Sequence, residues 1–338
     1  MKIVVTGGAG FIGSTLVRSL LDNGHQVTVV DDNSYGDITN LPSEVKSNLV
    51  LRWIDIREKA ELASLFKQIQ PDAVAHLAAI APLPDCQSDP SNAYSVNVGG
   101  TLQVLEACRY TNVQKVVFAS TGALYENNPI KHREEDCVNP DLIYPMTKYH
   151  AEQICKSYVK NYGLDITMLR LFNVYGVLQS KTRKHPAFMG YLTNCIKNNL
   201  PIKFYNNKNT ARDYINVKDV VRAFKILIEE QPKNANCKHI NIGSGKAHTV
   251  TDLLEQFKVN LSDKINYDFD FGFAEPIQFW DKYPELQNGT FNLDKSRLEH
   301  EVVHPTLADN LLASELLNWQ PTISIEEGIK EICDTLIL

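Results

Sequence analysis

Val5-Thr6-Gly7-Gly8-Ala9-Gly10-Phe11-Ile12-Gly13 is the stretch that decides the fold. An apolar run over residues 2–6 leads into its glycines, as in a buried parallel strand, and helical spacing follows over residues 11–21. Glycine lets a backbone approach a dinucleotide pyrophosphate closely, and the start of a helix offers unpaired N–H groups to phosphates. The spacing G-x-x-G-x-x-G therefore predicts a dinucleotide-binding loop at Gly7, Gly10 and Gly13, although a tight structural turn would explain the same triplet.

A carboxylate follows at the end of the second apolar run. Asp31 comes after the strand-like residues 26–30, where its side chain can accept hydrogen bonds from a ribose diol. Residues 31–40 contain no Arg, so a 2′-phosphate would be repelled there and NAD is favoured over NADP. A loop carboxylate that caps a turn is the alternative for Asp31. After the third strand, Asp55 either reaches the adenine or caps a helix before Arg57.

The rest of the first half alternates strand and helix patterns. Strand-like runs lie at 50–54, 73–77, 115–119 and 166–171, and helical patterns at 58–69, 94–110 and 147–162. This alternation predicts an α/β fold, a Rossmann-type doubly wound parallel sheet with a smaller C-terminal α/β lobe. We expect residues 1–172 to form the NAD-binding domain, with 214–245 returning to it, and residues 173–213 and 246–338 to form the substrate lobe.

Composition narrows the class of protein. The 338 residues carry a net charge of −6 and no long basic run, which argues against nucleic acid as a partner. The seven cysteines form no Cys-x-x-Cys pair, so we expect neither a metal site nor a disulfide framework. No apolar run has membrane-spanning length and no apolar signal region opens the chain, so we expect a cytoplasmic protein with no membrane contact.

Tyr144 and Lys148 form an i,i+4 pair if their segment is helical, so that both side chains share one face. Free tyrosine has a pKa of about 10, and lowering it to about 7 takes about 4 kcal/mol. An ammonium some 6 Å away contributes roughly 3 kcal/mol at an effective dielectric constant of about 20. The pair therefore predicts a general base that works near neutral pH, with ordinary surface packing as the alternative.

Hydroxyl groups close the fifth predicted strand. Ser120 and Thr121 follow Phe118-Ala119, and the carboxyl end of a parallel strand points into the crevice where ligands bind in such folds. Either hydroxyl could hydrogen-bond a reacting sugar oxygen. Ordinary capping at the strand end is the alternative.

Together these features resemble the extended short-chain dehydrogenase/reductase family, specifically its nucleotide-sugar epimerases of the UDP-glucose 4-epimerase type. The resemblance covers nearly the whole chain. Its motifs are Thr6–Gly13, Asp31, Asp55-Ile56, His76–Ala79, Asn97, Ser120-Thr121, Tyr144 with Lys148, Leu169–Gly176, Arg212–Val217, Asn241–Gly245, Trp319-Gln320-Pro321 and Ser324–Gly328.

The resemblance implies roles at matching positions. Tyr144 is similar to the catalytic acid/base, Lys148 to its nicotinamide-ribose partner and Thr121 to the catalytic Ser/Thr that also contacts the sugar. Substrate contacts are implied for Thr121, Asn173, Arg212 and Arg297, the two arginines pairing with the nucleotide diphosphate. The implied cofactor contacts are Gly7, Gly10, Phe11, Ile12, Gly13, Asp31, Asn33, Asp55, Ile56, Leu77, Ala78, Ala79, Asn97, Tyr144 and Lys148. A solvated helix charge is the alternative for Arg297.

Departures from the family pattern bear on the reaction. Family dehydratases carry an Asp-Glu pair after the catalytic Thr, whereas this chain has Gly122-Ala123, which cannot supply the extra acid. Glu126 replaces a common glycine, and the loop 80–85 is unusual. Thr306 matches a gatekeeper position, where a small residue leaves room for an N-acetyl group or a uronate.

The resemblance therefore predicts an NAD-dependent epimerase that acts on a nucleotide-sugar, at C4 of a UDP-sugar, through a transient 4-keto intermediate. The alternatives are a nucleotide-sugar 4,6-dehydratase or 4-keto-sugar reductase of the same family, and a non-catalytic NAD-binding regulator. We also expect a homodimer, paired through the helices at 94–110 and 147–162 as in relatives.

Overall fold

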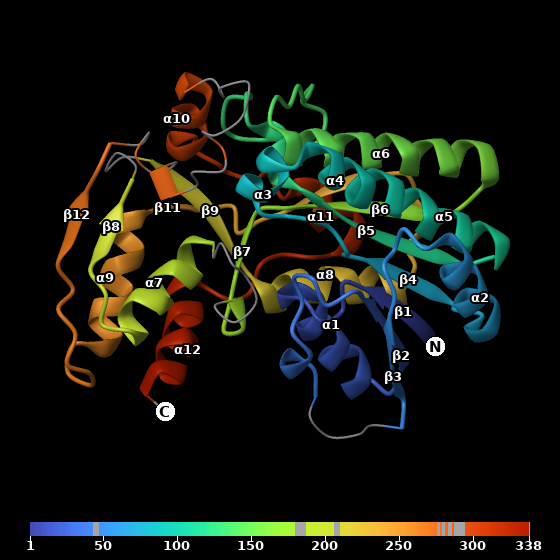
Figure 1. Cartoon of the computed structure of the whole chain (residues 1–338), viewed down its shortest axis with the longest axis horizontal. Helices are drawn as coiled ribbons and strands as arrows, with labels where there is room; N and C mark the ends of the chain where they lie inside the picture. Colours follow the sequence, from blue (N-terminus) through green and yellow to red (C-terminus); the bar gives the residue numbers. More distant parts are fainter. Residues whose placement is uncertain are drawn as a thin grey trace.

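The computed structural model describes residues 1–42, 47–179, 187–205, 210–275, 278, 281–282, 286 and 295–337, with the backbone alone for Lys233 and residues 295–298. Its centre is a seven-stranded parallel sheet in the order β10-β6-β5-β4-β1-β2-β3 (Figure 1). The strands are β1 (Lys2–Thr6), β2 (Gln26–Asp31), β3 (Leu49–Trp53), β4 (Ala73–His76), β5 (Lys115–Thr121), β6 (Ile166–Leu171) and β10 (His239–Ile242).

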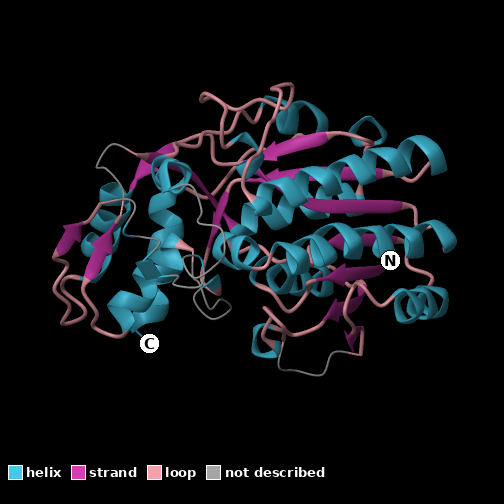
Figure 2. Ribbon diagram, turned by 45° about the horizontal axis from the view of Figure 1, so that its top comes forward, coloured by secondary structure: helices cyan, strands magenta, loops and turns pink. Residues whose placement is uncertain are grey.

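Helices cover both faces of this sheet, as Figure 2 shows. Helices α1 (Phe11–Asp22), α8 (Val217–Glu229) and α11 (Leu311–Leu317) pack on one face, and α2 (Lys59–Ile69), α5 (Thr101–Tyr110) and α6 (Ile143–Tyr162) on the other. The short helices between them are η1 (Ile38–Asn40), α3 (Leu83–Ser88), α4 (Pro90–Tyr94), η3 (Gly122–Tyr125) and η5 (Lys233–Ala235). The predicted doubly wound parallel sheet is confirmed.

Both faces of the sheet are buried at its central strand β1, which explains why this strand is a continuous apolar run. In β1, Ile3 and Val5 belong to the core beneath α1 and α8, whereas Val4 belongs to the core beneath α2 and α5. Successive side chains of a strand point to opposite faces, so a strand covered on both faces has no polar position to spare. Polar side chains such as Asp31, His76 and Thr121 therefore stand at the carboxyl ends of the strands.

A smaller lobe follows in the second half of the chain. Strands β7 (Asn173–Tyr175), β9 (Ala211–Asn216) and β11 (Ala247–Thr249) form a three-stranded sheet, and β8 (Ile202–Phe204) pairs with β12 (Phe271–Phe273). Helices α7 (Phe188–Lys197), α9 (Val250–Leu261) and α12 (Ile325–Ile337) share a separate apolar core with these strands, and α10 (Lys295–Val303) lies above it (Figure 1).

The two lobes are interleaved. Trp319 is fully buried in the core of the large sheet, and its Nε1 donates to Asp219 O at 3.0 Å. Helix α11 packs on α8 and β10, although the sequence assigns its segment to the smaller lobe. The side chains of both lobes are therefore fixed relative to one another at the junction.

One predicted helix is divided. The pattern at 94–110 predicts a single helix, but a π-helical turn, η2 (Ser95–Gly100), separates α4 from α5. Gly100 packs against Ile56, so closely that a Cβ there would lie 2.4 Å from Ile56 Cδ1. The irregular turn carries the buried Asn97.

No helix among the described residues is both long enough and apolar enough to cross a bilayer.

Candidate active site

The glycine-rich loop joins β1 to α1 and is shaped for close approach. Gly7 has a φ of +69°, which favours glycine, and a Cβ at Gly13 would lie 2.1 Å from Gly7 O. Helix α1 has Gly10 as its N-cap, no side-chain cap and no acidic residue in its first turn. Its first N–H groups are therefore available to an anion, and the loop fits a dinucleotide pyrophosphate.

Asp31 ends β2 beside this loop and is 6% exposed. Its Oδ2 accepts the Ala9 N–H at 3.0 Å, and its Oδ1 accepts the Asn33 N–H at 2.9 Å. Burial raises the pKa of this carboxyl group, while the two backbone hydrogen bonds oppose the rise. A carboxylate has further lone pairs, so Asp31 retains acceptors for a ribose diol.

The end of β4 closes the other side of the loop. A Cβ at Gly7 would lie 2.7 Å from Ala78 N, so the backbones of these segments nearly touch. His76 Nδ1 lies 2.7 Å from Thr6 Oγ1, and His76 Nε2 lies 2.9 Å from Thr101 Oγ1. Because burial lowers the pKa of His76 to about 3, its ring is a neutral structural link rather than a proton carrier.

Helix α6 carries the predicted acid/base pair. It begins at Ile143, so Tyr144 lies in its first turn and Lys148 in the next, as the spacing predicts. Lys148 is 3% exposed, and its Nζ lies 4.4 Å from the centroid of the Phe118 ring. Burial lowers the pKa of Lys148 to about 8. No carboxylate among the described residues is within ion-pair distance of this ammonium, so its charge acts on the cavity.

The end of β5 faces α6. Thr121 Oγ1 accepts the Ala123 N–H at 3.1 Å, which begins η3, and Ser120 Oγ donates to Glu152 Oε1 at 2.6 Å. Glu152 is one turn beyond Lys148 and forms a buried ion pair with Arg170, Nη2 to Oε2, at 2.8 Å. Both residues line the cavity, but the hydroxyl of Ser120 is bound to this buried polar network.

Two side chains that the sequence does not identify hold the start of α6. Glu126 Oε1 accepts the N–H groups of Asp141 and Leu142, and Gln87 Oε1 accepts the Ile143 N–H at 2.7 Å. Helix α6 has no side-chain cap from its own N-cap residue, and Gln87 accepts the first N–H of the helix from outside. Glu126 holds the two residues that lead into the helix, next to Tyr144.

Asn97 ties α6 to the loop after β4. Its Oδ1 accepts the Ile80 N–H at 2.8 Å, and its Nδ2 donates to Ile80 O and to Thr147 Oγ1, each at 3.0 Å. Thr147 Oγ1 in turn donates to Tyr144 O at 2.7 Å. Asn97 therefore fixes backbone positions on both sides of the cavity.

The smaller lobe contributes Asn173 and Arg212. Asn173 Nδ2 donates to Asp213 O at 2.9 Å and to Thr306 Oγ1 at 3.0 Å. Arg212 donates from Nε to His304 O at 3.2 Å and from Nη2 to Glu301 O at 2.5 Å. These carbonyls end α10, so Arg212 caps that helix while it also lines the cavity.

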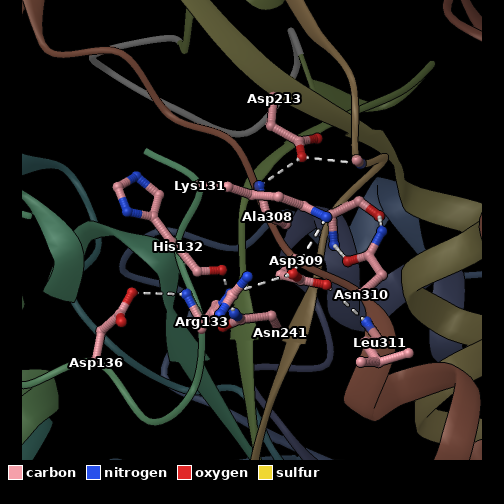
Figure 3. A network of polar contacts seen from close by, with 12 residues as sticks. Lys131, His132, Arg133, Asp136, Asp213, Asn241, Ala308, Asp309, Asn310 and Leu311 are labelled. Atoms are coloured by element: carbon pink, nitrogen blue, oxygen red, sulfur yellow. Dashed lines mark hydrogen bonds and ion pairs between the residues drawn. The ribbon is translucent and has the colours of Figure 1, made fainter. Parts of the chain in front are cut away.

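The segment from Ala308 to Leu311, which follows Thr306, makes polar contacts with both lobes (Figure 3). Asp213 Oδ2 accepts the Ala308 N–H at 3.0 Å, and the Asp309 N–H donates to His132 O at 2.9 Å. Lys131 Nζ lies 3.2 Å from Asp309 Oδ2. These contacts come from β9 and from the loop that follows η3, so the position of Thr306 depends on both lobes.

A single cavity of about 510 Å³ unites most of the predicted site residues. Its lining includes Gly7, Gly10, Phe11, Ile12, Gly13, Asp31, Ile56, Leu77, Ala78, Ala79, Thr121, Tyr144, Lys148, Asn173 and Arg212. Three predicted residues do not line it, namely Asn33, Asp55 and Asn97. The side chain of Arg297 lies outside the described residues.

Several lining residues were missed by sequence reasoning. Arg57 lines the cavity and donates from Nε to both oxygens of Asp55, at 3.0 and 2.9 Å, which lowers the pKa of that carboxyl group. Tyr35 lines it from the loop after β2. The position of Arg57 directly after the third strand was a usable signal, whereas Tyr35 lies in a loop without a recognisable pattern.

Comparison with known proteins gives consistent matches. The sequence model of the NAD dependent epimerase/dehydratase family matches residues 3–243. UDP-glucose 4-epimerase of Mycolicibacterium smegmatis is 31% identical over 332 residues, which cover 97% of this chain and 96% of that protein.

Two solved structures match over nearly their whole length. The UDP-glucose 4-epimerase of Thermotoga maritima with UDP-glucose has a TM-score of 0.83 and 29% identity, covering 99% of this chain and 98% of that one. The UDP-glucuronic acid 4-epimerase of Bacillus cereus with UDP-glucuronic acid and NAD has a TM-score of 0.81 and 28% identity, covering 99% of each chain.

Proposed function

Because the chain belongs to the NAD dependent epimerase/dehydratase family, we propose that it inverts C4 of a UDP-sugar through a transient 4-keto intermediate. The matches confirm three predictions from the sequence: the family, the class of enzyme and NAD as the cofactor. The sugar, the carbon and the intermediate are parts of the proposal.

The observation that carries the proposal is the shared cavity wall. Tyr144 and Lys148 occupy successive turns of α6, Thr121 ends β5, and all three line the cavity that also contains the glycine loop. A phenol, an ammonium and a hydroxyl beside a dinucleotide site are the groups needed to move a proton on and off a sugar alcohol. A protein that only binds NAD would not require them.

Residues of the large lobe would hold the cofactor. The N-terminus of α1 and the loop around Gly10 receive the pyrophosphate, and Asp31 accepts the ribose hydroxyls. Lys148 donates a hydrogen bond to the ribose that carries the nicotinamide. NAD, when bound, supplies a reversible acceptor for the hydride at C4 of the sugar.

Tyr144 would then act as the acid/base. The charge of Lys148 stabilises the phenolate, which takes the proton of the C4 hydroxyl and later returns it. Thr121 donates a hydrogen bond to the same sugar oxygen. The hydride leaves one face of the sugar and must return to the opposite face of C4. The sugar therefore has to rotate in the cavity while its diphosphate stays bound.

Asn173 and Arg212 are suited to hold that diphosphate. Both line the cavity on the side of the smaller lobe. In the structure the Nε and Nη2 groups of Arg212 cap α10, so binding of a diphosphate there is coupled to the position of that helix. Arg297 lies in the same helix and is proposed as the second arginine.

A 4,6-dehydratase is the weaker candidate. The residue after Thr121 is Gly122, and a Cβ there would lie 3.1 Å from the Phe172 ring. No acidic side chain fits at this position without moving that ring. A 4-keto-sugar reductase is distinguished by its need for stoichiometric reductant.

A substrate panel tests the proposal. The purified protein is incubated with UDP-glucose, UDP-glucuronate and UDP-N-acetylglucosamine, each without added reductant, and the products are separated by anion-exchange chromatography. We expect one substrate to reach equilibrium with its C4 epimer. A 4-keto-6-deoxy product, or turnover that requires added NADPH, would reject epimerisation.

A further inference from the structure

A hydrogen bond joins two loops on opposite sides of the glycine-rich loop. Tyr35 follows β2, Asp85 lies in α3 after β4, and the Tyr35 hydroxyl donates to Asp85 Oδ2 at 2.8 Å. In the sheet, β4 and β2 are the two neighbours of β1, whose carboxyl end leads into the glycine loop. The bond therefore joins segments that follow the two strands on either side of β1.

Both ends of this bridge are anchored. On the β2 side, the Asp37 N–H donates to Ala9 O at 3.0 Å, which ties the loop of Tyr35 to the glycine loop itself. On the β4 side, Asn97 holds both backbone groups of Ile80, as described above. The bridge thus connects two fixed points.

The bridge also belongs to the cavity. Ser34, Tyr35 and Gly36 after β2, Ala79 to Pro82 after β4 and the glycine loop all line it, whereas Asp85 lies behind this lining and holds Tyr35. The Tyr35 ring packs on an apolar cluster of Ile80, Cys86 and Ala93. Burial and the Asp85 carboxylate raise the pKa of Tyr35, so that its hydroxyl remains a donor.

We propose that the Tyr35–Asp85 bridge closes over the bound dinucleotide and slows its release. This inference rests on the proposed function, because an epimerase regenerates its NAD in each turnover and has no need to exchange it. Tyr35 and Asp85 are then positioning residues of the cofactor site, not catalytic residues.

The test is the rate of NAD release, measured by exchange of bound radiolabelled NAD against excess unlabelled NAD. Tyr35→Phe removes only the hydroxyl, and Asp85→Ala removes the acceptor. We expect each to speed release about tenfold, the loss of one hydrogen bond to a charged group. The double variant should release NAD no faster than Asp85→Ala alone, because that single change already breaks the bond to Tyr35.

Two further variants sharpen the result. Asp85→Asn keeps an acceptor and should release NAD at nearly the normal rate. Tyr158→Phe removes another tyrosine–carboxylate bond, Tyr158 to Glu106 at 2.8 Å, outside the cavity lining, and should change nothing.

Normal release rates in both Tyr35→Phe and Asp85→Ala would overturn the inference, even if the variants melt at a lower temperature. Faster release from a protein that epimerises no UDP-sugar would support the bridge while rejecting the proposed function.

Discussion

Lys148 is a cation buried against an aromatic ring without an ion-pair partner among the described residues. Burial disfavours its charged form and lowers its pKa to about 8, which places its loss of charge within the working range of an enzyme. In the proposed mechanism Lys148 must remain charged to stabilise the phenolate of Tyr144, so a pKa of about 8 would make activity depend on pH.

Activity should therefore fall as the pH rises through about 8, because neutral Lys148 no longer stabilises the phenolate. The measurement is kcat between about pH 6 and pH 10. Lys148→Arg keeps its charge throughout this range and should lose the alkaline fall, whatever its absolute rate. If kcat decreases with rising pH in the same way in the wild type and in Lys148→Arg, the decrease belongs to another titrating group.

Tyr144→Phe should lower kcat by about 100- to 10,000-fold, the usual contribution of general acid/base catalysis, because the ring keeps its packing but loses the proton carrier. NAD content, measured in the purified variant, should remain normal. Tyr149→Phe on the same helix is the control, since Tyr149 does not line the cavity, and should retain activity. A Tyr144→Phe variant with near-normal kcat would remove Tyr144 from the mechanism.

At this scale the sequence predicted much of the cavity lining, because the signals are local. The glycine triplet, Asp31 and the Tyr144–Lys148 spacing each depend on a few neighbouring residues. The contacts of Arg212 were not predictable, because its partners on α10 lie 89 to 92 residues away along the chain.

At the scale of elements, the start of α6 is the decisive feature. Tyr144 is in the first turn of this helix, whose first N–H donates to Gln87 and whose preceding residue Leu142 donates to Glu126. The sequence showed Glu126 only as a departure from the family pattern. Its partners, the two residues just before α6, are 15 and 16 residues away, and the partner of Gln87 is 56 away, so these contacts emerge only from the folded chain.

Glu126→Ala should lower the free energy of unfolding by about 1–3 kcal/mol, because the N–H of the buried Leu142 loses its acceptor, and should lower kcat through a displaced Tyr144. Glu126→Gln keeps an acceptor oxygen and should restore most of both. Urea unfolding and kcat are measured on each variant. Equal effects of Ala and Gln would show that the charge, not the cap, matters.

The whole molecule shows how the two lobes define one cavity. The large lobe supplies the glycine loop, Asp31 and α6, while the smaller lobe supplies Asn173 and Arg212. The alternating pattern of the first half predicted the large sheet well. The interleaving of α11 and Trp319 with that sheet was not predictable, since a short amphipathic segment does not reveal which core it joins.

A homodimer through α5 and α6 remains a prediction. Tyr110 and Tyr162, at the ends of these helices, are 65% and 55% exposed, which a partner subunit would cover. Light scattering should give twice the chain mass of 38.1 kDa, and Tyr110→Glu with Tyr162→Glu should reduce it to the monomer. Val259→Glu, on a side chain 67% exposed in α9, is the control. A wild-type mass of one chain would contradict the dimer.

The most direct test of the central claim follows the hydrogen at C4. UDP-glucose, or whichever panel substrate reacts, carries deuterium at C4 and is incubated with the protein in ordinary water without added reductant. Proton NMR should show the C4 epimer with its deuterium retained, because the same hydride leaves and returns within one site. An epimer with hydrogen from water at C4 would contradict oxidation and reduction at that carbon.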